Sequence, residues 1–148
     1  MAYATAAEIQ TDFKNIDFSQ SNASVVTATV TQFIAEADAL INAYVGSRYA
    51  IPITAEGGLS LMKLLSRSLV VARIKALLEV KRATNTDGVQ NVVTTFLTPT
   101  QVMKILADIR DDNLNVDGAT QLVTNSGFYS QNVNDSVESV IKKDTKQW

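Results

Sequence analysis

Residues 24–48 read SVVTATVTQFIAEADALINAYVGSR, and this stretch decides the fold class. Its apolar residues recur three or four positions apart, which places them on one face of an α-helix. They are Val26, Val30, Phe33, Ala37, Leu40 and Tyr44. Asn22 and Ser24 are candidate N-terminal caps. Because Pro52 cannot continue a helix, we expect this one to end near residue 48.

Two shorter helices are predicted from their N-terminal signals. Thr5 and Glu8 have the spacing of a capping box, in which the two side chains satisfy backbone N–H groups at a helix start. We expect a helix over 6–14. Thr98 and Gln101 repeat this spacing, with Pro99 at the first helical position. The helix that follows, over 99–112, has one apolar side formed by Val102, Ile105, Leu106 and Ile109.

A second long helix is predicted over 59–83, and it is apolar on two sides. The first strip consists of Leu61, Leu65, Leu69, Ala72, Ala76 and Val80, and the second of Leu64, Val71, Ile74 and Leu78. A helix that is apolar on more than one side is either central in its own domain or shared with a neighbour. Since the chain has only two long helices, we predict that the second strip contacts another subunit.

These patterns predict an all-α fold, a small helical bundle with two long and two shorter helices. Residues 51–54 read as an extended link, and Gly57-Gly58 as a flexible turn. Residues 84–98 form either a loop or a short β-hairpin arm. We expect a helical core over 1–118 and a flexible C-terminal tail over 119–148, which becomes ordered when it binds a partner.

The predicted tail is rich in Gln, Asn, Ser and Thr, but part of it has helical spacing. Val133, Val137, Val140 and Ile141 recur at this spacing, and the chain ends at Trp148. So short a helix is marginal on its own in water. We therefore expect these five residues to bind a groove on a partner.

Composition excludes many kinds of chemistry. The 148 residues suffice for about one domain. They include no Cys and no His, so disulfides, thiolate nucleophiles, Cys/His zinc sites and imidazole catalysis are all absent. We predict no enzyme and no catalytic, cofactor-binding or metal-binding residue. The alternative is a divalent-cation site near a helix end, with carboxylate oxygens of Asp108, Asp111 and Asp112 as ligands.

The net charge of −2 is too balanced for a protein that coats nucleic acid. Basic residues nevertheless concentrate between residues 48 and 82, where there are seven of them and only two acidic residues. The alternative function is a nucleic-acid-binding module that uses Lys63, Arg67, Arg73, Lys75, Lys81 and Arg82. The apolar stretch 59–80 carries too many charges to cross a membrane, and residues 1–5 do not read as a signal peptide. We expect synthesis in a reducing cytoplasm.

Three pieces of the sequence, in this order, resemble the head–tail connector (adaptor) proteins of tailed bacteriophages and prophages, especially the Mu-like branch. The first is MAYAT at 1–5, which leads into the first helix. The second is ADALINAYVGSRY at 37–49 followed by Pro52, and the third is VMKILADIR at 102–110 with a turn at 117–118. The resemblance covers residues 1–118.

This resemblance implies a structural virion protein. Such subunits form a ring, commonly of twelve copies, below the portal in the head–tail neck. The ring extends the DNA channel and supports the next neck, stopper or tail protein. DNA is only passing cargo, and no membrane is involved. The resemblance also implies that the C-terminal tail binds the portal. The residues expected to make this contact are Val133, Val137, Val140, Ile141 and Trp148.

Overall fold

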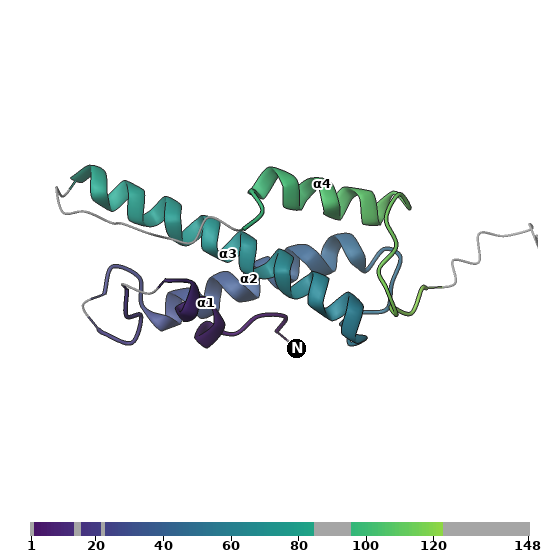
Figure 1. Ribbon diagram of the computed structural model, residues 1–148, viewed down its shortest axis with the longest axis horizontal. Coiled ribbons are helices and arrows are strands. Elements are labelled where there is room, and N and C mark those ends of the chain that lie inside the picture. The colour runs from purple at the N-terminus through teal and green to yellow at the C-terminus, as the bar shows by residue number, and fades with distance from the viewer. Residues whose placement is uncertain (1, 14–15, 22, 85–95, 123–148) are drawn as a thin grey trace, which may run out of the picture.

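The protein is described by a computed structural model, over residues 2–13, 16–21, 23–84 and 96–122. Within these ranges the chain forms four helices and no strand of a sheet: α1 (Ala6–Asp12), α2 (Thr27–Val45), α3 (Glu56–Thr84) and α4 (Pro99–Arg110). The long helices α2 and α3 pack on each other, and both α1 and α4 pack on the pair (Figure 1). The predicted all-α fold is confirmed.

The capping boxes of α1 and α4 are both present. In α1 the Thr5 hydroxyl accepts a hydrogen bond from the Glu8 N–H at 3.3 Å, and the Glu8 carboxylate accepts one from the Thr5 N–H at 3.0 Å. Thr98 and Gln101 make the same exchange at the start of α4. Each helix ends two residues earlier than predicted, at residue 12 and residue 110.

The prediction for α2 needs two corrections. The helix begins at Thr27, since the Phe18 carbonyl accepts hydrogen bonds from both the N–H and the hydroxyl of that residue, each at 2.9 Å. Of the two candidate caps, Ser24 is not the N-cap and Asn22 lies outside the described residues. The helix also buries Ile34, Ile41 and Val45, whereas the predicted Leu40 and Tyr44 are only partly buried.

The Gly57-Gly58 pair was predicted as a turn, but it lies in the first turn of α3. Glycine is needed at these helical positions because the loop that follows α4 approaches α3 closely. A Cβ atom on Gly58 would lie 2.8 Å from Val116 Cγ1 and 2.9 Å from the carbonyl oxygen of Asp117. The N–H of Gly58 donates to that same carbonyl at 3.0 Å. The glycines therefore serve close packing here, not a change of chain direction.

A buried polar network centred on Asp38 ties the N-terminal segment to α2 and α3. Asp38 is only 6% exposed, and its carboxylate accepts hydrogen bonds from the Tyr3 N–H at 3.0 Å and the Ser66 hydroxyl at 2.7 Å. The Tyr3 hydroxyl donates to Asn42 Oδ1 at 2.7 Å and accepts from the Ile53 N–H at 3.3 Å. Burial, and to a lesser extent the charge of Asp38, raise the pKa of Tyr3.

The described core continues past the predicted boundary at residue 118. Tyr49 and Gln121 form an antiparallel bridge. The N–H of Ala50 donates to Thr120 at 2.9 Å, and the N–H of Leu122 donates to Arg48 at 2.6 Å. Residues 119–122 are thus held against the end of α2. The predicted loop or hairpin at 84–98 lies mostly outside the described residues, which resume at Phe96.

Candidate functional site

The predicted subunit-contact strip on α3 is not one exposed strip. Val71, Ile74 and Leu78 are 1%, 0% and 7% exposed and belong to a core cluster with α1 and α2. The prediction that this side lacks partners within the chain is therefore wrong for these three residues, because α1 and α2 cover them. Leu64 differs, since it is 42% exposed. It alone of the four remains a candidate contact residue.

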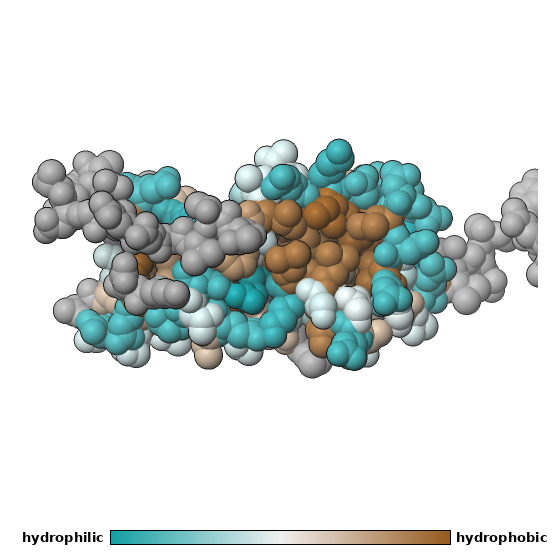
Figure 2. All heavy atoms as spheres, viewed as in Figure 1, coloured by the Kyte–Doolittle hydropathy of each residue, from teal (hydrophilic) through white to brown (hydrophobic). Residues whose placement is uncertain are grey.

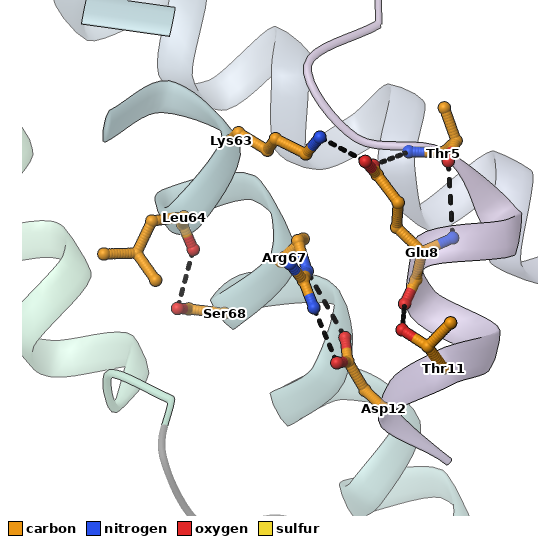
Figure 3. Close-up of polar contacts among 8 residues, drawn as sticks. All are labelled: Thr5, Glu8, Thr11, Asp12, Lys63, Leu64, Arg67 and Ser68. Carbon is orange, nitrogen blue, oxygen red and sulfur yellow. Dashed lines mark hydrogen bonds and ion pairs between the residues drawn. The ribbon is translucent and has the colours of Figure 1, made fainter. Parts of the chain in front are cut away.

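Leu64 belongs to an apolar surface between α3 and α4. Hydrophobic residues gather on one face of the molecule over α4 and the adjoining half of α3 (Figure 2). The Leu64 side chain points away from α1, toward the side on which α4 lies (Figure 3). Leu61 of α3 and Ile105 of α4 are partly buried and pack on the core cluster that α4 completes. The α3/α4 surface is defined here by Leu61, Leu64 and Ile105.

The basic residues of α3 pair with carboxylates of the same chain. Lys63 forms an ion pair with Glu8, and Arg73 forms one with Glu36. Arg67 makes two contacts with the buried Asp12, at 2.6 Å and 3.4 Å (Figure 3). These pairs join α3 to α1 and α2. Cations held in this way are poor candidates for phosphate contacts, which disfavours the nucleic-acid alternative.

The remaining basic candidates add little to a nucleic-acid site. Lys75 lines an apolar cavity of about 310 Å³ between α3 and residues 96–99, together with Glu79. The side chains of Lys81 and Arg82 lie outside the described residues. The described part of the chain thus brings no basic cluster together on one open face of α3.

The ion pair between Glu8 and Lys63 predicts a pH dependence of stability. Burial raises the pKa of Glu8, but hydrogen bonds from Lys63 and Thr5 outweigh burial, and the pKa falls below its ordinary value of 4.5. A depressed pKa stabilises the folded state above the ordinary value, and this contribution disappears as the pH falls through the depressed pKa. Between about pH 5 and pH 3, the wild type should lose more stability than Glu8→Gln.

Urea unfolding at a series of pH values measures this difference. Glu56→Gln, which removes an exposed carboxylate at the start of α3, is the matched control and should follow the wild type. Equal acid sensitivity in the wild type and Glu8→Gln would show that Lys63 does not stabilise the Glu8 carboxylate.

Arginines pair with two members of the predicted acidic cluster at the end of α4. Arg110 forms an ion pair with Asp111 at 2.7 Å, and its hydrogen bond lowers the pKa of Asp111. Arg48 forms an ion pair with Asp112. No three acidic side chains within the described ranges are grouped so that they could hold a metal ion. Arginines thus bind two of the three carboxylates, and the arrangement gives no support to a cation site at Asp108, Asp111 and Asp112.

Arg48 and Tyr49 hold the end of α2 against the end of α4. Arg48 Nη1 donates to the Ile109 carbonyl at 2.8 Å, so a cation lies at the negative end of the α4 dipole. The Tyr49 hydroxyl accepts from the Val116 N–H at 3.1 Å and lies 3.4 Å from Asn115 Oδ1. Arg48 and Tyr49, just after α2, therefore both stabilise the contact between the end of α2 and the end of α4.

Sequence reasoning did not identify three exposed apolar residues near this point. Ile51, Leu114 and Leu122 are 48%, 38% and 45% exposed, and all three lie in loops. Only Leu114 had a signal in the sequence, because it stands between two asparagines. The predicted partner-binding residues Val133, Val137, Val140, Ile141 and Trp148 lie outside the described residues, and their role stays a prediction.

Comparison with known protein families identifies the class of this helical protein. The family model described as Bacteriophage Mu, Gp36 matches residues 3–132. The chain therefore belongs to this bacteriophage family. Membership in this family supports a role as a phage virion protein. The match extends past residue 118, where the predicted core ended. No curated protein matches the chain. No helix in the described ranges is long and apolar enough to cross a membrane.

Proposed function

We propose that this protein is a head–tail connector (adaptor) subunit of a phage virion. Copies of it form a ring below the portal, twelve by the resemblance, and the ring extends the DNA channel. One side of the ring meets the portal, and the other supports the next neck, stopper or tail protein. DNA passes through without being bound tightly. The protein is made in the cytoplasm of the bacterial host and ends in the neck of the virion.

The observation that carries this proposal is the exposed α3/α4 surface in a chain of a phage family. Leu64 of α3 is 42% exposed, and Leu61 of α3 and Ile105 of α4 are only partly buried. Apolar surface of this kind is typical of contacts between proteins. A ring needs each subunit to contact two neighbours, and this surface supplies one of the two contacts. The pairing of the α3 cations within the chain favours this function over nucleic-acid binding.

Replacement of Leu64 with aspartate tests the ring contact. A carboxylate that becomes buried between subunits without a partner is strongly unfavourable. We expect Leu64→Asp to weaken association between copies at least tenfold, measured by analytical ultracentrifugation over a range of protein concentrations in the presence and absence of portal rings. Because Leu64 is exposed, the helical circular dichroism of the Leu64→Asp variant should match that of the wild type.

Ala28→Asp is the control, because Ala28 is exposed in the first turn of α2, where an acidic residue is favourable. It should associate like the wild type. If Leu64→Asp and Ala28→Asp assemble equally well, the α3/α4 surface is not the contact between subunits.

A further inference from the structure

Three exposed apolar residues gather at one end of the bundle, which we call the end face: Ile51, Leu114 and Leu122. The segments that carry them are bonded together around the end of α2. Leu122 donates its N–H to Arg48, Leu114 adjoins the Asn115 that contacts Tyr49, and Ile51 is two residues beyond Tyr49. Figure 1 shows the α2–α3 link and the chain after α4 side by side at this end. The end face thus lies apart from the start of α2 and from α1.

The end face is bordered by acidic residues. The segments 46–58 and 108–122 carry five carboxylates and two guanidiniums, a net formal charge of −3. Arg110 and Arg48 pair with Asp111 and Asp112, so the net charge comes from Glu56, Asp108 and Asp117, of which Glu56 and Asp117 are exposed. Figure 2 shows mainly hydrophilic residues at this end of the molecule. An apolar centre with a charged rim is the usual anatomy of a protein interface. A partner that fits it has an apolar surface flanked by basic groups.

The chain itself indicates which partner this is. The described core ends at Leu122, which is part of the end face, and 26 residues follow it. These include Val133, Val137, Val140, Ile141 and Trp148, the predicted partner-binding residues. A protein bound by this segment is kept at a high local concentration near residue 122. A second contact with the same protein at the end face therefore loses little additional entropy.

We propose that the end face docks directly on the protein that the C-terminal segment binds. This inference rests on the proposed function, in which that protein is the portal. The end of the bundle that carries Leu114 and Leu122 then faces the portal, and the opposite end, at the start of α2, faces away from it. The C-terminal segment and the end face act as two linked contacts with one partner.

The double variant Leu114→Asp/Leu122→Asp tests this orientation. Both leucines are exposed in the subunit, so the variant should fold, and each new carboxylate in the apolar centre of the end face would be buried against the apolar surface of the partner. We expect the variant to bind portal rings purified from the same phage at least tenfold more weakly than the wild type does, measured by surface plasmon resonance. Its self-association should equal that of the wild type. Ala28→Asp, at the other end of α2, should bind like the wild type.

Cross-linking from single cysteines is a second measurement that does not depend on weakened binding. Because the chain has no Cys, Leu114→Cys and Ala28→Cys can each be labelled at one site with a benzophenone maleimide. Irradiation in the presence of portal rings should join the portal to residue 114 and not to residue 28.

The possible results separate the two proposals. If the wild type binds portal rings, but the double variant binds as tightly and residue 28 cross-links instead of residue 114, only the orientation is wrong. If the wild type does not bind portal rings, the proposed function fails and the orientation fails with it. If the double variant loses self-association and residue 114 cross-links only to another copy, the end face joins subunits and the proposal is overturned.

Discussion

Replacement of Asp38 with alanine should lower the free energy of unfolding by about 3–5 kcal/mol, which is the largest stability effect that we expect from one substitution. The carboxylate accepts hydrogen bonds from the Tyr3 N–H and the Ser66 hydroxyl. Tyr3 is 4% exposed and Ser66 is fully buried, so water cannot replace the lost acceptor at either group. Each unsatisfied buried donor costs about 1–3 kcal/mol.

Asp38→Asn is the matched comparison for this prediction. The amide keeps one oxygen for the Tyr3 N–H and turns its nitrogen toward the Ser66 oxygen, so both groups retain a partner. We expect this variant to lose about 1–2 kcal/mol. Urea unfolding monitored by circular dichroism measures both values. An alanine variant as stable as the asparagine variant would show that the buried network does not hold the N-terminal segment to α2 and α3.

Removal of residues 130–148 should leave the helical core folded and abolish attachment to portal-bearing heads. The deletion begins after the bridge between Tyr49 and Gln121, so every described contact of the core is retained. It removes all five predicted partner-binding residues: Val133, Val137, Val140, Ile141 and Trp148. Loss of one of two linked contacts lowers the apparent affinity by about 10²–10⁴, which is enough to prevent attachment at ordinary concentrations.

A full-length variant controls for the length of the chain. Replacement of the three valines and Ile141 with asparagine keeps 148 residues but removes the apolar spacing, and it should fail to attach like the truncation. Trp148→Ala should weaken attachment less, because it removes a single aromatic anchor. Co-sedimentation with purified heads measures all three variants. Attachment of the truncated chain at the wild-type level would contradict the role given to the tail.

The helices were predictable from the sequence because their signals are local. The capping boxes at Thr5 and Thr98 each depend on a residue three positions away, and the structure contains both. The apolar spacing after residue 24 likewise indicated α2. Two errors arose where a distant group decided the local structure. The Phe18 carbonyl decides the start of α2, and the loop around Asp117 explains the glycines of α3.

The candidate site was harder to predict, because periodicity shows which faces of a helix are apolar and not what covers them. Ile74 was expected to contact another subunit, yet α1 and α2 bury it completely. The ion pairs between Arg67 and Asp12 and between Lys63 and Glu8 link residues 55 positions apart in the chain. Local patterns carry no information on such pairs. For the same reason, Asp38 on the apolar side of α2 gave no indication of its partners.

Native mass spectrometry of the full-length protein mixed with portal rings from the same phage tests the central claim most directly. We expect one discrete complex, in which a portal ring carries a closed set of about twelve copies of this subunit, and we expect Leu64→Asp to abolish this complex. A portal ring that keeps its own mass in the presence of excess folded protein would contradict the proposed role as a connector subunit.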